Sequence, residues 1–124
     1  MIQNPISKST PSNNLKFYSD VGEVQVEVLI NFLDISRAVL AQALGFPPDA
    51  LRQERLTGRA LDRVTELASA IEYVSETFDG NLKQTLYWIK TPNLNFGGFS
   101  PRQLILNGKY KKVRDFILDA RTSK

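Results

Sequence analysis

Apolar residues recur at helical spacing between residues 57 and 78, and this pattern constrains the fold more than any other feature of the chain. The repeating positions are Leu61, Val64, Ala68, Ile71, Val74 and Phe78. Because residues three and four apart share one face of an α-helix, the pattern predicts a long amphipathic helix that begins after Thr57. We expect it to be the central helix of the fold.

Shorter helices with recognisable ends are predicted on both sides of this helix. Ser36 can cap a helix over 37–44, and Pro47-Pro48 opens another that runs to about residue 55. Asn81 can cap a helix over 82–90, and Ser100-Pro101-Arg102-Gln103 has the pattern of a capping box. A last amphipathic helix is predicted from 109 to about 120.

Residues 21–33 fit two structures. Residues 24–28 alternate as a strand does, whereas Val21, Val24, Val28, Phe32 and Ile35 fall on one helical face. No second convincing strand is present to pair with this stretch, and a lone strand would leave its backbone groups unsatisfied, so we favour a helix. The sequence therefore predicts an all-α fold of about seven helices in one body.

The chain divides into three regions by composition. Residues 1–19 are rich in Ser, Asn and Pro and predict a flexible tail, although Leu15, Phe17 and Tyr18 could dock on the body. Residues 20–57 predict a helix-turn-helix-like unit, and residues 58–124 a second helical domain. Residues 1–57 carry five Lys/Arg against six Asp/Glu, whereas residues 58–124 carry eleven against seven. The basic C-terminal part indicates either an acidic partner or a solvated helix face.

The chain has no cysteine and no histidine. Their absence excludes disulfides, thiolate nucleophiles, Ser-His triads and the usual zinc sites. Paired carboxylates such as Glu72 and Glu76 leave an unusual enzyme open, but a solvated helix surface explains them better. We therefore expect neither an enzyme nor a cofactor. No apolar run is long enough to span a bilayer and no signal pattern is present, so we expect a cytoplasmic location without membrane contact.

Residues 37–55 have the spacing of a helix-turn-helix. Ala41 allows close crossing of two helices, and Gly45 stands at the turn between them. In such units the second helix lies in the DNA major groove and its exposed side chains contact base edges. The candidate DNA-binding residues are Arg37, Arg52, Gln53 and Arg55. A helical corner kept only for packing is the alternative.

The connector Trp88 to Pro101, WIKTPNLNFGGFSP, is unusually rich in aromatic residues, Pro and Gly. Pro92 ends the preceding helix, Gly97-Gly98 gives two permissive backbone positions, and Ser100-Pro101 starts the next helix. These residues predict a loop of fixed shape. Its aromatic residues either complete the core or form anchors for a protein partner.

This connector and the residues after it resemble the toxin-binding domain of the Xre/MbcA/ParS antitoxin family. The matching pattern is Trp88-Ile89-x-x-Pro92-Asn93-x-x-Phe96-Gly97-Gly98-x-x-Pro101, followed by Leu104-Ile105 and Gly108-x-x-x-x-Val113-x-x-Phe116-Ile117. The resemblance covers about residues 59–120, and the unit before it matches the family's N-terminal half. Ile89 and Phe96 stand where Leu is commoner in the family. The basic run at residues 109–112 is also a departure from the family pattern.

The resemblance implies a type II antitoxin that covers the active site of an NAD-consuming RES-domain toxin and in many members also represses its own operon. It implies assembly as a homodimer or a larger complex with the toxin, and operator DNA as a further partner. The expected toxin contacts are Asn93, Asn95, Phe96, Gly97, Gly98, Phe99, Arg102, Lys109 and Lys112. We expect Trp88, Pro92 and Pro101 to support the loop. The alternative function is a DNA-binding transcriptional regulator with no toxin partner.

Overall fold

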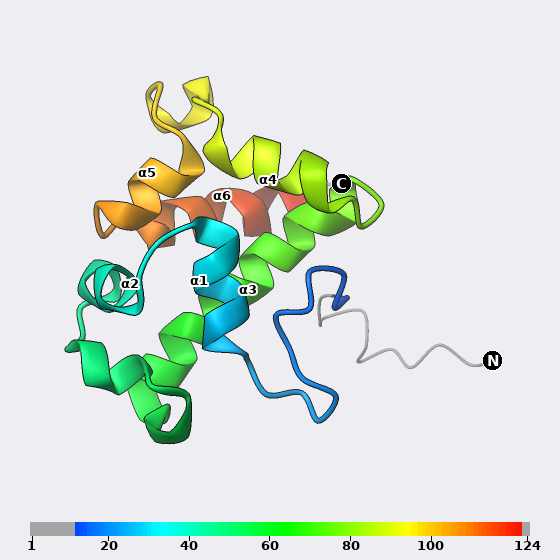
Figure 1. Cartoon of the computed structure of the whole chain (residues 1–124). Coiled ribbons are helices and arrows are strands. Elements are labelled where there is room, and N and C mark those ends of the chain that lie inside the picture. Colours follow the sequence, from blue (N-terminus) through cyan, green and yellow to red (C-terminus); the bar gives the residue numbers. More distant parts are fainter. Residues whose placement is uncertain (1–11, 123–124) are drawn as a thin grey trace.

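Six α-helices joined by turns and short 3-10 segments make up residues 12–122, the part of the chain that the computed structural model describes (Figure 1). The helices are α1 (Val26–Leu33), α2 (Arg37–Leu44), α3 (Gly58–Thr77), α4 (Leu82–Lys90), α5 (Pro101–Leu106) and α6 (Tyr110–Thr122). The prediction of an all-α fold is confirmed. Within residues 12–122, β-structure is limited to one isolated antiparallel bridge between Tyr18 and Val24. The choice of a helix for the ambiguous stretch is confirmed for residues 26–33 only, because Val21 lies in a turn and Val24 in the bridge.

The long helix α3 is the centre of the fold, as its periodicity predicts. It has 20 residues, about 30 Å at 1.5 Å per residue, and it packs against α2, α4 and α6. Val64, Ala68, Ile71 and Val74 are buried along its apolar face. Helix α6 packs against α3, behind it in the view of Figure 1, and buries Tyr110, Val113 and Ile117.

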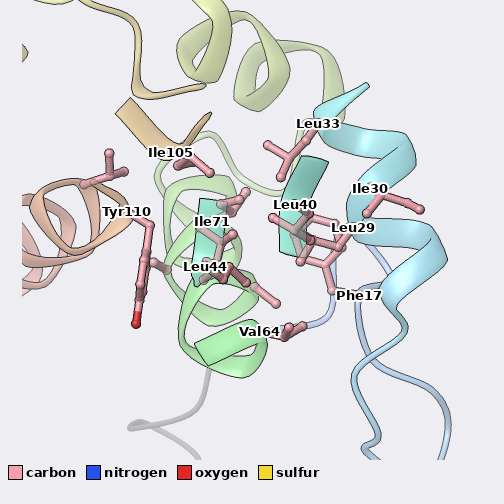
Figure 2. Close-up of a cluster of buried hydrophobic side chains, with 14 of the residues drawn as sticks. Phe17, Leu29, Ile30, Leu33, Leu40, Leu44, Val64, Ile71, Ile105 and Tyr110 are labelled. Atoms are coloured by element: carbon pink, nitrogen blue, oxygen red, sulfur yellow. The ribbon is translucent and has the colours of Figure 1, made fainter. Parts of the chain in front are cut away.

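The two helical regions expected from the sequence share one hydrophobic core. Leu29, Leu40 and Leu44 come from the first region, and Ile71 and Ile105 come from the second. Figure 2 shows these side chains directed toward a common centre between α1, α2, α3 and α5. The chain boundary expected near residue 57 therefore does not separate two cores.

The segment expected to form a seventh helix, from 47 to about 55, instead forms two 3-10 turns, η2 (Pro48–Leu51) and η3 (Gln53–Arg55). Arg52 between them has extended backbone angles, with φ −64° and ψ 134°. This break allows Leu51 to be fully buried, while η2 packs against α2 and α3. Packing of Leu51 therefore takes precedence over helix continuation.

Residues 12–19 are not the flexible tail expected over 1–19 but pack on the body, which confirms that Leu15, Phe17 and Tyr18 dock there. Residues 1–11 of that prediction lie outside the described residues. Phe17 is fully buried and meets Phe32 edge-to-face, with ring centroids 5.4 Å apart. The backbone N–H of Leu15 donates to Oε2 of Glu72 at 2.9 Å, and Gln25 N–H donates to the carbonyl of Phe17 at 2.7 Å. An extended segment held in this way has no helical period, which is why its pattern gave no sign of structure.

Glu72 is fully buried under this segment, and its titration gives a first prediction. Burial raises the pKa of Glu72, and hydrogen bonds from Leu15 N–H and the Ser75 hydroxyl lower it in part. Because the folded pKa lies above the ordinary value of 4.5, the folded state binds the proton more tightly than the unfolded chain does. The carboxylate thus opposes folding above its folded pKa, and this penalty disappears as the pH falls toward 4.5.

We therefore expect wild-type protein to gain stability relative to Glu72→Gln as the pH falls from about 7 toward the ordinary glutamate value. Urea unfolding of both proteins over this pH range measures the difference in free energy of unfolding. A difference that stays constant with pH would contradict the prediction.

Candidate protein-binding loop

The loop between α4 and α5, residues 91–100, is closed by hydrogen bonds to Asn93. The carbonyl of Asn93 accepts from Phe96 N–H at 2.9 Å and from Gly98 N–H at 3.0 Å, and its own N–H donates to the carbonyl of Phe99 at 3.1 Å. Its side-chain Oδ1 accepts from Asn95 N–H at 2.8 Å. These bonds fix the shape of the short turn η4 (Leu94–Phe96). Asn93, expected as a toxin contact, uses its side-chain oxygen inside the loop.

The far end of the loop is fixed by the capping box that the sequence predicts. Gln103 N–H donates to the hydroxyl oxygen of Ser100 at 3.0 Å, and Ser100 N–H donates to Oε1 of Gln103 at 2.8 Å. Pro101, expected to support the loop, is buried at the first position of α5. Pro92 is exposed where the chain leaves α4. The loop is thus anchored on both sides by helix ends.

Phe96 connects the loop to the core. Its ring lies between Trp88 of α4, at a centroid distance of 6.2 Å, and Phe116 of α6, at 5.1 Å, with edge-to-face geometry on both sides. The side chain is only 9% exposed. Phe96 is among the expected contacts, but its burial makes it a support of the loop together with the half-buried Trp88.

Leu94 and Phe99 are the apolar side chains that the loop presents to solvent, with exposed fractions of 94% and 49%. Phe99 was expected as a contact, whereas Leu94 was not. Phe96 is buried at the end of the 3-10 turn that Leu94 begins, whereas Leu94 itself is almost fully exposed. The exposed Asn95 lies beside Leu94. The side chains that the loop exposes are therefore those of Leu94, Asn95 and Phe99.

Gly97 and Gly98 both have left-handed backbone conformations, with φ of 69° and 89°. A Cβ atom at either position would meet nothing within 4 Å, so space does not explain the glycines. A non-glycine residue in this region costs about 1–2 kcal/mol, and Asn tolerates it better than Ala does. The glycines thus serve the turn and not a close approach of two segments.

We expect Gly97→Ala to lower the free energy of unfolding by about 1 kcal/mol and Gly97→Asn to lower it by less. Urea unfolding of the two variants compares them under the same conditions. Equal losses for Ala and Asn would contradict a purely conformational role for Gly97.

The three basic residues expected at the toxin interface lie in different surroundings. Arg102 donates from Nε to the carbonyl of Leu33 at 2.6 Å and from a terminal nitrogen to that of Asp34 at 3.0 Å. It therefore completes the C-terminal end of α1 and has a structural role. Lys109 and Lys112 are exposed at the start of α6, at the end of α5 away from the loop (Figure 1). They do not join the surface around Leu94.

The candidate DNA-binding residues are mostly engaged within the chain. The side-chain amide of Gln53 donates to the carbonyl of Val24 at 2.9 Å and accepts from Val26 N–H at 3.0 Å. Arg52 pairs with Asp49 at 3.2 Å and Glu54 at 3.5 Å, and Arg37 pairs with Glu27. Arg55 is exposed. These contacts, and the 3-10 turns that replace the second helix, leave no helical row of donors in this region.

Comparisons of this chain with protein-family models, with curated proteins and with solved structures find no match. Within residues 12–122, no helix is both long enough and apolar enough to cross a membrane. The same residues contain no group of three or more acidic side chains placed to hold a metal ion.

Proposed function

We propose that the chain is a cytoplasmic antitoxin that binds a RES-domain toxin through the loop at residues 91–100 and covers the toxin's active site. The observation that carries the proposal is the exposure of Leu94 and Phe99 on a loop whose shape is fixed before binding. The resemblance of the Trp88 to Pro101 motif to the Xre/MbcA/ParS family supports the class of partner.

The energetics of the loop favour binding to a protein. Covering a fully exposed leucine side chain contributes about 1.5–3 kcal/mol, and covering Phe99, which is 49% exposed, contributes about half as much. The hydrogen bonds of Asn93 and the buried ring of Phe96 hold the loop in place, so little conformational entropy is lost when a partner binds. Rigid apolar anchors of this kind dominate the affinity of many interfaces.

Operator DNA is not included as a partner in this proposal. The side chains of Arg37, Arg52 and Gln53 make contacts within the chain. A protein that binds DNA specifically needs several free donors on one element that enters the groove. Arg55 alone does not supply them.

Coexpression with the RES-domain toxin from the adjacent reading frame tests the proposal. We expect the chain to co-purify with the toxin and to restore growth of cells in which the toxin is induced. The proposal fails if the two proteins purify separately and growth stays arrested although the chain is folded and abundant.

A further inference from the structure

Residues 80–114 contain seven Lys and Arg residues and no Asp or Glu. Two of these basic residues bond within the chain: Arg102 to backbone carbonyls at the end of α1, and Arg114 to Glu66 and Asp115. The other five, all exposed, are Lys83, Lys90, Lys109, Lys111 and Lys112. The positive charge is thus carried by lysines on α4 and at the start of α6.

Tyr87 lies between two of these lysines on the outer face of α4. Lys83 precedes it by four residues and Lys90 follows it by three, so the three side chains share one side of the helix. Tyr87 is 73% exposed, which is unusual for an aromatic residue in the middle of a helix. This lysine–tyrosine–lysine face has no carboxylate on α4 to neutralise it.

Beside this face is a groove of about 430 Å³ between α4, the end of α3 and the start of the loop. Its walls include Phe78, Lys83, Tyr87, Trp88, Thr91 and Pro92. The surface is therefore mainly apolar, with one ammonium group at its edge. Asn93 also borders the groove, so it adjoins the loop that carries Leu94.

We propose that this groove binds an acidic segment of the protein partner, with an apolar side chain in the groove and carboxylates against Lys83 and Lys90. The inference rests on the proposed function in taking the toxin as the source of that segment. Apolar contact with Tyr87 and Trp88 supplies affinity, and the lysines supply long-range attraction and orientation.

A protein segment fits this surface better than a nucleic acid does. Both arginines of residues 80–114 are held by internal contacts, so none is available for the bidentate contacts that arginine makes with phosphate or guanine. A leucine-rich or aromatic acidic peptide would use both the charge and the apolar surface.

Trp88 allows a direct test, because it is the only tryptophan and it lines the groove. The probe is a synthetic peptide without tryptophan that has leucines three or four residues apart, to give one apolar helical face, and glutamates at the positions between them. A peptide with lysine in place of each glutamate is the control. We expect the acidic peptide to shift the fluorescence of Trp88, with an affinity that falls as salt rises. The lysine peptide should cause no shift.

Charge reversal locates the binding site. Lys83→Glu with Lys90→Glu should weaken binding of the acidic peptide by about tenfold or more. The matched control is Arg55→Glu with Arg59→Glu, which changes the net charge equally near the first turn of α3, about 30 Å from its other end. We expect the control to bind within about threefold of wild type, a difference of about 0.7 kcal/mol.

Three results would overturn the inference: no response of Trp88 to the acidic peptide, equal weakening by the two charge reversals, or displacement of the peptide from the groove by a single-stranded oligonucleotide that binds more tightly. The toxin itself separates this inference from the proposed function. If the chain binds the acidic peptide but not the toxin, the proposed function is wrong, and the groove is still a site for acidic peptides. If the Lys83/Lys90 variant binds the toxin as wild type does and no peptide enters the groove, the inference fails alone.

Discussion

We expect the double substitution Leu94→Ala and Phe99→Ala to weaken binding of the proposed partner, a RES-domain toxin, by about a hundredfold or more. Central apolar anchors contribute at least about 2 kcal/mol each when truncated, although their effects are not strictly additive, and about 2.7 kcal/mol corresponds to a hundredfold change in Kd. Both side chains are exposed in the free protein, so their removal should change the free energy of unfolding by no more than about 0.5 kcal/mol each. The loss of binding would then come from the interface and not from the fold.

Titration calorimetry with the toxin measures this loss, and urea unfolding of the same samples measures stability. Val21→Ala is the matched control, because Val21 is an apolar residue with 81% exposure on the turn that precedes α1. We expect the control to bind the toxin as wild type does. If the double variant binds with wild-type affinity, the loop is not part of the interface.

Much of the fold follows from local signals in the sequence. Ser36, Asn81 and Ser100 all accept the backbone hydrogen bonds expected of N-caps, because capping depends only on residues within one turn. The helix predicted from the 3–4 spacing of apolar residues over 57–78 is also confirmed, since an apolar stripe of this length fits few structures other than a helix. Thr57 does precede α3 but makes no side-chain capping bond, so a helix start can be correct while its expected cap is not.

The parts that sequence reasoning missed or left open depend on contacts between distant residues. The turns η2 and η3 follow from burial of Leu51 against α2 and α3, which no local pattern predicts. The docking of residues 12–19 depends on a carboxylate from Glu72, 57 positions away from Leu15. Because both effects are tertiary, composition and periodicity cannot reveal them.

The candidate site shows the same division. The rigidity of the loop was predictable from Pro92, the glycine pair and the capping box, which all act locally. The sequence did not predict which aromatic residue of the loop is buried, because Phe96 is held in the core by its contacts with Trp88 on α4 and Phe116 on α6. Arg102 is likewise a residue type common at interfaces, but its guanidinium donates to the Leu33 carbonyl at the end of α1.

Phe96→Ala gives the largest expected change in stability, about 3–5 kcal/mol, because it removes a buried ring between two aromatic neighbours and leaves a cavity. A loss of this size is a large fraction of the roughly 5–15 kcal/mol that stabilises a typical domain. Urea unfolding followed by the fluorescence of Trp88 measures it, since Trp88 contacts the ring directly. Phe99→Ala, on the exposed side of the same loop, is the control and should change stability by no more than about 0.5 kcal/mol.

Phe96→Leu separates support of the loop from contact with the toxin. Leucine fills much of the same space, so this variant should lose less stability than Phe96→Ala, and a loop that keeps its shape should still present Leu94 and Phe99. We therefore expect Phe96→Leu to bind the toxin within about threefold of wild type, a difference of about 0.7 kcal/mol. A Phe96→Leu protein that stays folded but loses toxin binding as severely as the Leu94/Phe99 variant would mean that the ring of Phe96 leaves the core and meets the partner directly.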